Sequence, residues 1–216
     1  MLRVIRQIGI WTQARRAARR AANQDGTAAV EFAMLMPVMI TLFFGVMESS
    51  LALICRSDVS LMASTAGDLI SQVSTASKAD ISNVYSAAGT VLYPYYDPAE
   101  TDLTQPDAAK PTIRITSVID DGSGAAGQNH LTGKVAWSCT QSGSGSLPAA
   151  PAVNSSVTLP QPLMTDKGSI VIADISYLYT SPTSKMINKS ITFTNRFYAK
   201  PRRVLQIPSP TGGCPP

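Results

Sequence analysis

The sequence has little charge for its length of 216 residues. Charged residues make up only 15% of the chain, whereas hydrophobic residues reach 44%. Soluble domains usually carry about 25% charged residues. This deficit excludes an intrinsically disordered chain, because disorder requires high charge together with low hydrophobicity. The composition favours a membrane-associated or secreted protein.

Histidine is even rarer, since His130 is the only one. The sequence offers it no partner pattern for a zinc site or a Ser/His/Asp triad. Neither a Walker motif nor a dinucleotide-binding glycine motif occurs. The run Asp120-Asp121-Gly122-Ser123-Gly124 lacks the spacing and the final glutamate of an EF-hand, and it predicts a hairpin turn instead. We therefore expect no catalytic residues, no metal, no cofactor and no enzymatic activity.

The positive charge of the chain is confined to its start. Residues 1–26 hold six arginines and one aspartate, for a net charge of +5, whereas residues 27–216 hold 12 bases and 13 acids, for a net charge of −1. The sequence pI of 9.0 is therefore a property of the first 26 residues. Nucleic-acid binding needs a basic excess on the folded body, so the charge distribution argues against it.

An uncharged apolar run follows the basic block. It covers the sixteen residues Phe32–Met47, and extending it over 28–54 adds only Glu31 and Glu48 as charges. A helix of 27 residues is about 40 Å long, and the hydrocarbon core of a bilayer is about 30 Å thick. A buried core helix could hold the same run, but the adjoining basic block favours a transmembrane helix.

The arginines predict the orientation of this helix. Six precede it, and only Arg56 and Lys78 occur within about 25 residues after it. The positive-inside rule then places the N-terminus in the cytoplasm and the downstream chain outside. A cleaved secretory signal peptide fits less well, because the nearest small-x-small site, Ser64-Thr65-Ala66, lies far beyond Met47.

A glycine and a glutamate lie at the junction between the leader and the apolar run. Gly26 ends the polar leader, Thr27 begins the run, and Glu31 is its fifth residue. A carboxylate inside a membrane segment is costly and usually has a partner. Cleavage after Gly26 would give Thr27 a free α-amino group, which could pair with Glu31 of a neighbouring subunit. The alternative is that Glu31 lies at the interface and reaches the headgroups.

The rest of the chain changes from a helical to an extended pattern. Apolar residues three or four apart predict an amphipathic helix over 56–93, which could continue the span into one helix over 28–92. Residues 94–111 are predicted to form a loop. Strands are predicted at Thr112–Ile119, Leu131–Cys139, Ser169–Thr180 and Ser190–Tyr198, with a long loop at 140–165. Four strands without intervening helices indicate an antiparallel sheet and an α+β fold.

The chain has three cysteines. Cys55 lies at the outer end of the predicted span, and we expect it to act as a small apolar residue or an intermolecular contact. Cys139 and Cys214 lie in the predicted exported part, where disulfides persist. A bond between them would tie the C-terminal tail to the second strand and add roughly 4 kcal/mol of stability, less any strain. Two free thiols are the alternative.

The stretch over residues 26–50 resembles the TadE-like family, the pseudopilins of the Tad (tight adherence, Flp-type) pilus system. The resemblance rests on Ala-Ala-Val-Glu-Phe at 28–32, on Pro37, and on Gly45-Val46-Met47-Glu48 at the far end. Looser similarity to longer TadE/TadG-type members occurs at 135–139, 169–180 and 197–203.

The resemblance implies specific roles for these residues. Gly26 and Thr27 would form a prepilin processing site, and Glu31 with Phe32 would set the register of assembly. Pro37, Gly45 and Glu48 would belong to the surface that packs against other helices. The fold would be a long transmembrane and amphipathic helix followed by a pilin-like antiparallel sheet.

The predicted organisation has four segments. A basic cytoplasmic leader occupies 1–26, a transmembrane helix 27–55, an amphipathic helix extension 56–93, and an exported antiparallel β domain 94–216. The implied function is that of a minor pseudopilin in the bacterial inner membrane, with the C-terminal domain in the periplasm. The pilus or the cell surface would be its further location after assembly. A prepilin peptidase, other Tad pilins and the inner-membrane assembly platform would be its partners. An uncleaved, membrane-anchored periplasmic binding module of a secretion or adhesion system is the alternative, and a membrane-tethered enzyme is a third hypothesis without support from the sequence.

Overall fold

A computed structural model describes residues 2–97, 110–124, 127–181 and 189–215, with side chains from Gly26 onward. The chain divides into two compact units, Met1–Ser49 and Ser50–Pro216. Helix α1 (Leu2–Ser71) begins in the first unit and ends in the second.

Among the described residues, the first unit consists of the first part of helix α1 alone. The backbone stays helical through Pro37, although proline lacks the N–H that would close one helical hydrogen bond. Two hydroxyl groups bond back to the helix itself: Thr41 Oγ1 donates to the Pro37 carbonyl at 2.8 Å, and Ser49 Oγ donates to the Gly45 carbonyl at 2.7 Å. Such local bonds satisfy hydroxyls that have no water to bond, which suits a helix in lipid.

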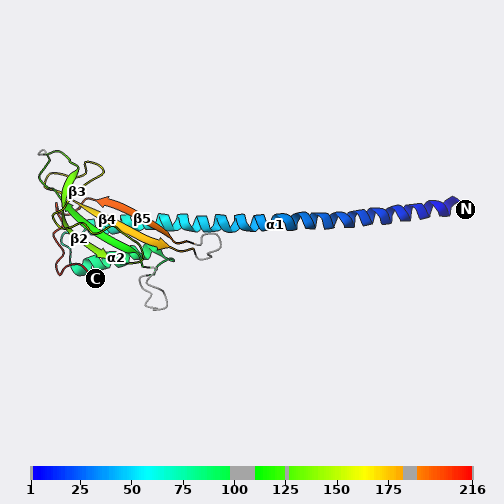
Figure 1. Cartoon of the computed structure of the whole chain (residues 1–216), viewed down its shortest axis with the longest axis horizontal. Helices are drawn as coiled ribbons and strands as arrows, with labels where there is room; N and C mark the ends of the chain where they lie inside the picture. The colour runs from blue at the N-terminus through cyan, green and yellow to red at the C-terminus, as the bar shows by residue number, and fades with distance from the viewer. Residues whose placement is uncertain (1, 98–109, 125–126, 182–188, 216) are drawn as a thin grey trace. The chain divides into compact units, whose positions relative to one another are not determined.

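The second unit is built on one antiparallel sheet of five strands in the order β3-β2-β1-β4-β5 (Figure 1). The strands are β1 (Thr112–Ile119), β2 (Thr132–Gln141), β3 (Ser156–Thr158), β4 (Ser169–Tyr179) and β5 (Ile191–Ala199). Strand β1 pairs with β2 and β4, which places the two most apolar strands at the centre of the sheet. The predicted α+β class with an antiparallel sheet is confirmed.

Four of the five strands lie where the sequence predicts them. Strand β1 has the predicted limits, and the ends of β2, β4 and β5 differ from the predictions by one or two residues. Strand β3 was not predicted, since it lies in the stretch expected to be a loop at 140–165. It has only three residues, and its pairing with Thr132, Gly133 and Lys134 of β2 defines it.

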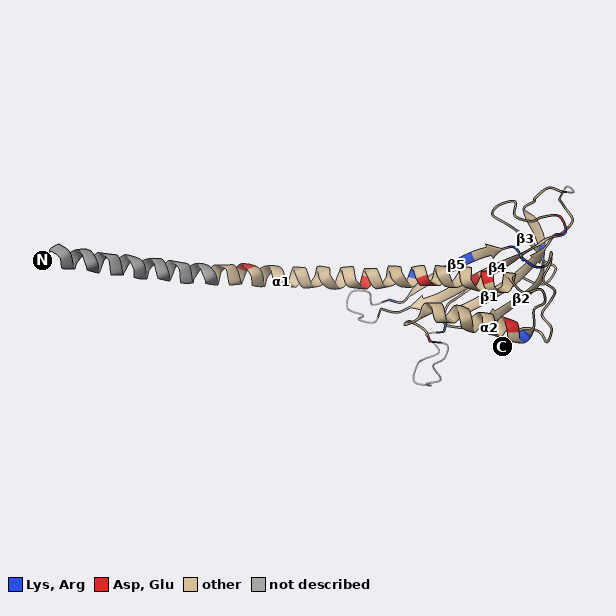
Figure 2. Ribbon diagram, turned by 180° about the vertical axis from the view of Figure 1, so that it is seen from behind, with Lys and Arg blue, Asp and Glu red and all other residues tan. Residues whose placement is uncertain are grey.

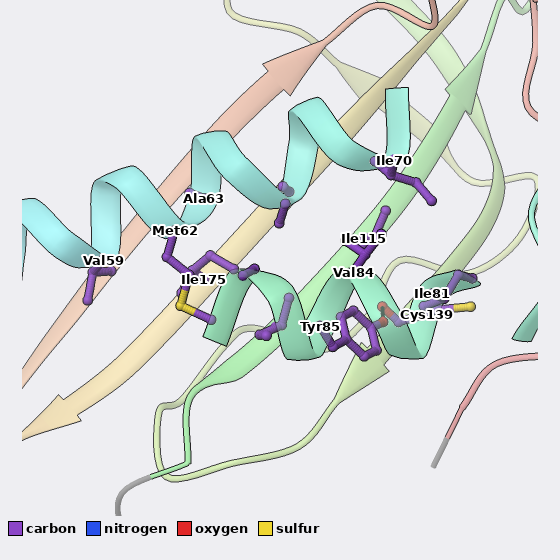
Figure 3. Close-up of a cluster of buried hydrophobic side chains, with 14 of the residues drawn as sticks. Val59, Met62, Ala63, Ile70, Ile81, Val84, Tyr85, Ile115, Cys139 and Ile175 are labelled. Atoms are coloured by element: carbon purple, nitrogen blue, oxygen red, sulfur yellow. Dashed lines mark hydrogen bonds between the residues drawn. The ribbon is translucent and has the colours of Figure 1, made fainter. Parts of the chain in front are cut away.

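One face of the sheet is covered by the second part of α1 and by α2 (Lys78–Gly89). Figure 3 shows Met62 and Ala63 of α1 and Tyr85 of α2 in one buried cluster with Ile115 of β1 and Ile175 of β4. Tyr85 is fully buried, and its hydroxyl donates to the Cys139 carbonyl at 2.9 Å. This burial raises the pKa of the Tyr85 phenol, because the charged phenolate would lose its hydration.

The other face of the sheet is covered by the segment between β2 and β4. Leu159 and Met164 of this segment pack against Val118, Ile170 and Ile172 of the central strands. Strand β4 is therefore buried on both faces, which explains why its sequence is apolar almost throughout rather than alternating.

The helix expected to continue to residue 92 is interrupted. Helix α1 ends at Ser71, α2 begins at Lys78, and a short 3-10 helix, η1 (Thr90–Leu92), follows. Ser77 caps α2 in a capping box, in which its side chain accepts from the Asp80 N–H and the Asp80 carboxylate accepts from the Ser77 N–H. The spacing of apolar residues does not reveal this break, because a serine three residues before an acid can start a new helix within such a pattern.

The C-terminal tail ties the helices to the sheet. Its residue Thr211 bridges the junction between α1 and α2, since Lys78 N donates to the Thr211 carbonyl and Thr211 N donates to the Ala76 carbonyl, both at 3.0 Å. Trp137 Nε1 on β2 donates to the Ile207 carbonyl at 3.0 Å. The disulfide between Cys139 and Cys214, with a Cα–Cα distance of 5.2 Å, completes the attachment. The predicted bond is confirmed, and Cys55 is a buried free cysteine.

Candidate functional site

The apolar part of α1 exposes large hydrophobic side chains. The exposed fraction is 66% for Phe32, 81% for Met34 and 64% for Phe43. Figure 2 shows few charged residues along this part of the helix. Within the described residues, Gly26–Ser71 forms a helix long and apolar enough to cross a membrane. Burying such side chains in lipid is favourable by about 25 cal/mol per Å² of apolar surface, so this helix indicates membrane anchoring.

The two predicted processing residues lie at the start of this helical stretch. Gly26 is exposed, and a Cβ built on it would meet no atom within 4 Å. Glu31 lies four residues after Thr27 in α1, so the two share one face of the helix. Glu31 is exposed and takes part in no ion pair within the described residues. The structure thus presents its carboxylate on the helix surface, where a partner from another molecule can reach it.

The predicted packing residues lie further along the same helix. Pro37 and Gly45 are eight residues apart, and with Thr41 and Ser49 they recur every four residues along one side of α1. Small residues at this spacing let a second helix approach closely in a membrane. Glu48 is buried, unlike Glu31, so the two acids of the apolar run lie in different surroundings.

Sequence reasoning missed a row of charged residues on the second face of the sheet. The strand register places Asp174 of β4 between Arg114 of β1 and Arg196 of β5. Arg114 Nη2 lies 3.0 Å from Asp174 Oδ2, and Arg196 Nε lies 2.5 Å from Asp174 Oδ1. The hydrogen bond and charge of Asp174 raise the pKa of Arg196. Only the register brings the three together, since they are far apart in sequence.

A small hollow of about 170 Å³ lies beside this row, between Pro148, Val157 and Ile172. Arg114 is 3% exposed and also donates to the Pro148 carbonyl at 2.7 Å. The guanidinium of Arg114 therefore bonds to groups of the protein itself. We infer that the charged row helps to hold the segment between β2 and β4 on this face of the sheet.

These features define a class of protein: a chain anchored by one apolar helix, with an α+β unit on an antiparallel sheet. Residues 26–68 match the family model described as TadE-like protein, so the resemblance found in the sequence is confirmed over this segment. No curated protein and no solved structure matches the chain. The matched segment begins at Gly26 and includes Glu31, Pro37, Gly45 and Glu48.

The match covers the apolar part of helix α1 and less than half of the chain. It ends at residue 68, before the end of α1 and the first strand. The family model therefore covers the apolar helix and most of the part of α1 that packs on the sheet, whereas the rest of the α+β unit is known from its structure alone.

Proposed function

We propose that the chain is a minor pseudopilin required for assembly of the Tad pilus. In this proposal it is inserted in the bacterial inner membrane with residues 1–26 in the cytoplasm and the α+β unit in the periplasm. The observation that carries the proposal is the match to the TadE-like family model over residues 26–68, on a helix with exposed apolar side chains. The basic leader and the disulfide in the α+β unit agree with this orientation.

A prepilin peptidase would cut the chain between Gly26 and Thr27. The cut would release the basic leader and leave a positively charged amino group on Thr27. In a stack of subunits this group would pair with the exposed Glu31 carboxylate of a neighbour. Opposite charges in a low-dielectric environment attract strongly, so the pair would offset the cost of placing both groups near lipid and would fix the axial register.

The helix surface from Phe32 to Ile54 would supply the contacts with other Tad pilins and with the inner-membrane assembly platform. Pro37 and Gly45 lie on the side of α1 that carries small residues. Close packing of helices on such a side is a main source of association in membranes, where the hydrophobic effect does not drive one helix toward another.

The processing step is tested by replacing Gly26 with leucine in cells that make the pilus. Because a Cβ at Gly26 would meet no neighbour, the substitution should leave the fold intact and block cleavage, so the full-length chain accumulates in the membrane. Gly45→Leu is the matched control, since this helical glycine is equally open, and it should be trimmed normally. Normal trimming of Gly26→Leu would contradict cleavage that depends on Gly26. A full-length chain in the wild type and in both variants would argue for an uncleaved, anchored periplasmic module.

The pairing step is tested with Glu31→Gln, which removes the charge and keeps the size of the side chain. Membrane insertion and cleavage should remain, whereas piliation counted in electron micrographs should fall sharply. Asp166→Asn is the control, because it also replaces an exposed carboxylate by an amide but lies outside the apolar helix. Normal piliation in Glu31→Gln cells would contradict the proposed register contact.

A further inference from the structure

The connection between β1 and β2 brings three side chains close together, although no known motif in the sequence predicts this. Asp120 and Asp121 directly follow β1, and His130 lies just before β2. One ligand atom from each of the three residues lies within 4.8 Å of the other two. His130 Nε2 lies 2.8 Å from Asp120 Oδ1 and 3.9 Å from Asp121 Oδ1. We call these three residues the Asp-Asp-His cluster.

The surrounding backbone fixes the positions of all three residues. His130 is held by a bridge to Met164, in which His130 N donates to the Met164 carbonyl at 3.0 Å and Met164 N donates back at 3.2 Å. A Cβ added at Gly124 would collide with the His130 imidazole. Glycine at this position therefore lets the backbone lie directly against the imidazole ring. The position of His130 is thus fixed by Gly124 and by the bridge to Met164.

Both carboxylates of the cluster accept hydrogen bonds from nearby residues. Asp120 accepts from the Gly122 N–H at 2.9 Å and from the Lys167 N–H at 2.8 Å, and Asp121 accepts from the Ser123 hydroxyl at 2.5 Å and the Ser123 N–H at 3.0 Å. Among the described residues, no lysine or arginine side chain pairs with either carboxylate. The two carboxylates, with side chains 7% and 11% exposed, have the His130 imidazole beside them, which carries a charge only when it is protonated.

The imidazole of His130 is an independent indication of a missing ligand. Its Nε2 atom pairs with Asp120 Oδ1 at 2.8 Å. Its Nδ1 atom is shielded from solvent and has no hydrogen-bond partner in the part of the chain that the structure describes. Buried polar atoms in native proteins are almost always bonded, so an unbonded imidazole nitrogen beside two carboxylates favours a bound cation.

We propose that Asp120, Asp121 and His130 bind a divalent transition-metal ion of the zinc class. Zinc accepts imidazole nitrogens and carboxylate oxygens as ligands, and a zinc site with three protein ligands leaves a fourth position for water. Calcium fits this set less well, because it takes six to eight oxygen ligands. The ion would cross-link the end of β1 to the start of β2 and neutralise the two carboxylates. The site is independent of the pilus proposal and would stand if that proposal failed.

The test uses the full chain, purified in detergent with its disulfide intact, stripped of metal with a chelator and titrated with Zn²⁺. Because His130 is the only histidine, the imidazole nitrogen signals in a ¹⁵N NMR spectrum belong to one residue. The proposal predicts one equivalent of bound Zn²⁺ in calorimetry and a shift of one imidazole nitrogen on binding. Calcium at the same concentration should leave these signals unchanged.

Two variants and one control assign the ligands. Asp121→Asn and His130→Gln should each weaken Zn²⁺ binding by more than about tenfold, because loss of even an outer-shell partner commonly costs 10–100-fold in metal affinity. Asp166→Asn removes an exposed carboxylate close in sequence to the Lys167 amide that bonds Asp120, and its affinity should equal that of the wild type. Unshifted imidazole signals in the wild-type chain, equal affinity in all variants, or a response to Ca²⁺ instead of Zn²⁺ would overturn the proposal. The wild-type NMR result decides the question even if a variant does not fold.

Discussion

Asp174 is the residue on which the charged row of the sheet depends. It is 4% exposed, and its carboxylate bonds Arg114 on one side and Arg196 on the other. A buried charge without its partner is far more costly than the intact pair. Loss of Asp174 should therefore cost more free energy at Arg114, which is 3% exposed, than at Arg196, whose side chain is half exposed.

We predict that Asp174→Asn lowers the free energy of unfolding by about 3–5 kcal/mol, because it leaves the Arg114 guanidinium buried without its counter-ion. Arg196→Gln should cost much less, about 1 kcal/mol, since this guanidinium is half exposed and an exposed pair contributes little. Denaturant unfolding of the detergent-solubilised chains measures both values. Equal losses in the two variants would mean that the row does not act through burial of Arg114.

The break between α1 and α2 is the main feature at the scale of secondary-structure elements. The Ser77 side chain accepts from the Asp80 N–H at 3.1 Å, and the Asp80 carboxylate accepts from the Ser77 N–H at 3.0 Å. We predict that Ser77→Ala lowers the free energy of unfolding by about 1 kcal/mol, the usual effect of losing an N-cap. Ser82→Ala, in an exposed position within the same helix, should be neutral or slightly stabilising. Matching losses in the two variants would argue against the cap.

The same cap predicts a dependence of stability on pH. Hydrogen bonds from the Ser77 side chain and backbone lower the pKa of Asp80 in the folded chain. The stabilisation by Asp80 is therefore fully present above the pKa of an unfolded aspartate, about 3.9, and is lost as the pH falls through the lower folded value. The difference in unfolding free energy between the wild type and Asp80→Asn should be constant near neutral pH and should shrink below about pH 4. A difference that grows in acid would contradict this assignment.

The C-terminal tail connects the elements covalently. The bond between Cys139 and Cys214 closes a loop over a sequence separation of 75 residues. We predict that Cys214→Ser lowers the free energy of unfolding by about 2–4 kcal/mol under oxidising conditions. Adding a reductant should lower the free energy of unfolding of the wild type to that of the variant. The value for the variant itself should not change. A variant as stable as the oxidised wild type would show that the tail is held by its hydrogen bonds alone.

At the scale of the whole molecule, the sequence predicted those parts in which a pattern repeats. Alternation located β1 (Thr112–Ile119) at its observed limits, and the apolar run located the exposed helix. The cysteine positions also indicated the correct bond. Each of these predictions rested on local composition or on a pair of residues with few alternatives.

The remaining features depend on contacts that local patterns do not contain. Strand β3 is defined by its pairing with β2 and has no alternation of its own. The row of Arg114, Asp174 and Arg196 follows from the strand register, and the Asp-Asp-His cluster follows from the course of the connection between β1 and β2. The capping box at Ser77 was different, because its serine and aspartate were visible in the sequence and could have located the helix break.

The central claim concerns the state of the mature chain in the membrane. Intact-mass spectrometry of the protein extracted from cells that assemble the pilus measures it directly. The account predicts a chain that begins at Thr27, lacks the six arginines of the leader, and carries one disulfide. A mass that still includes residues 1–26 in piliated cells would contradict the proposed cleavage, and with it the pairing of a new amino group with Glu31.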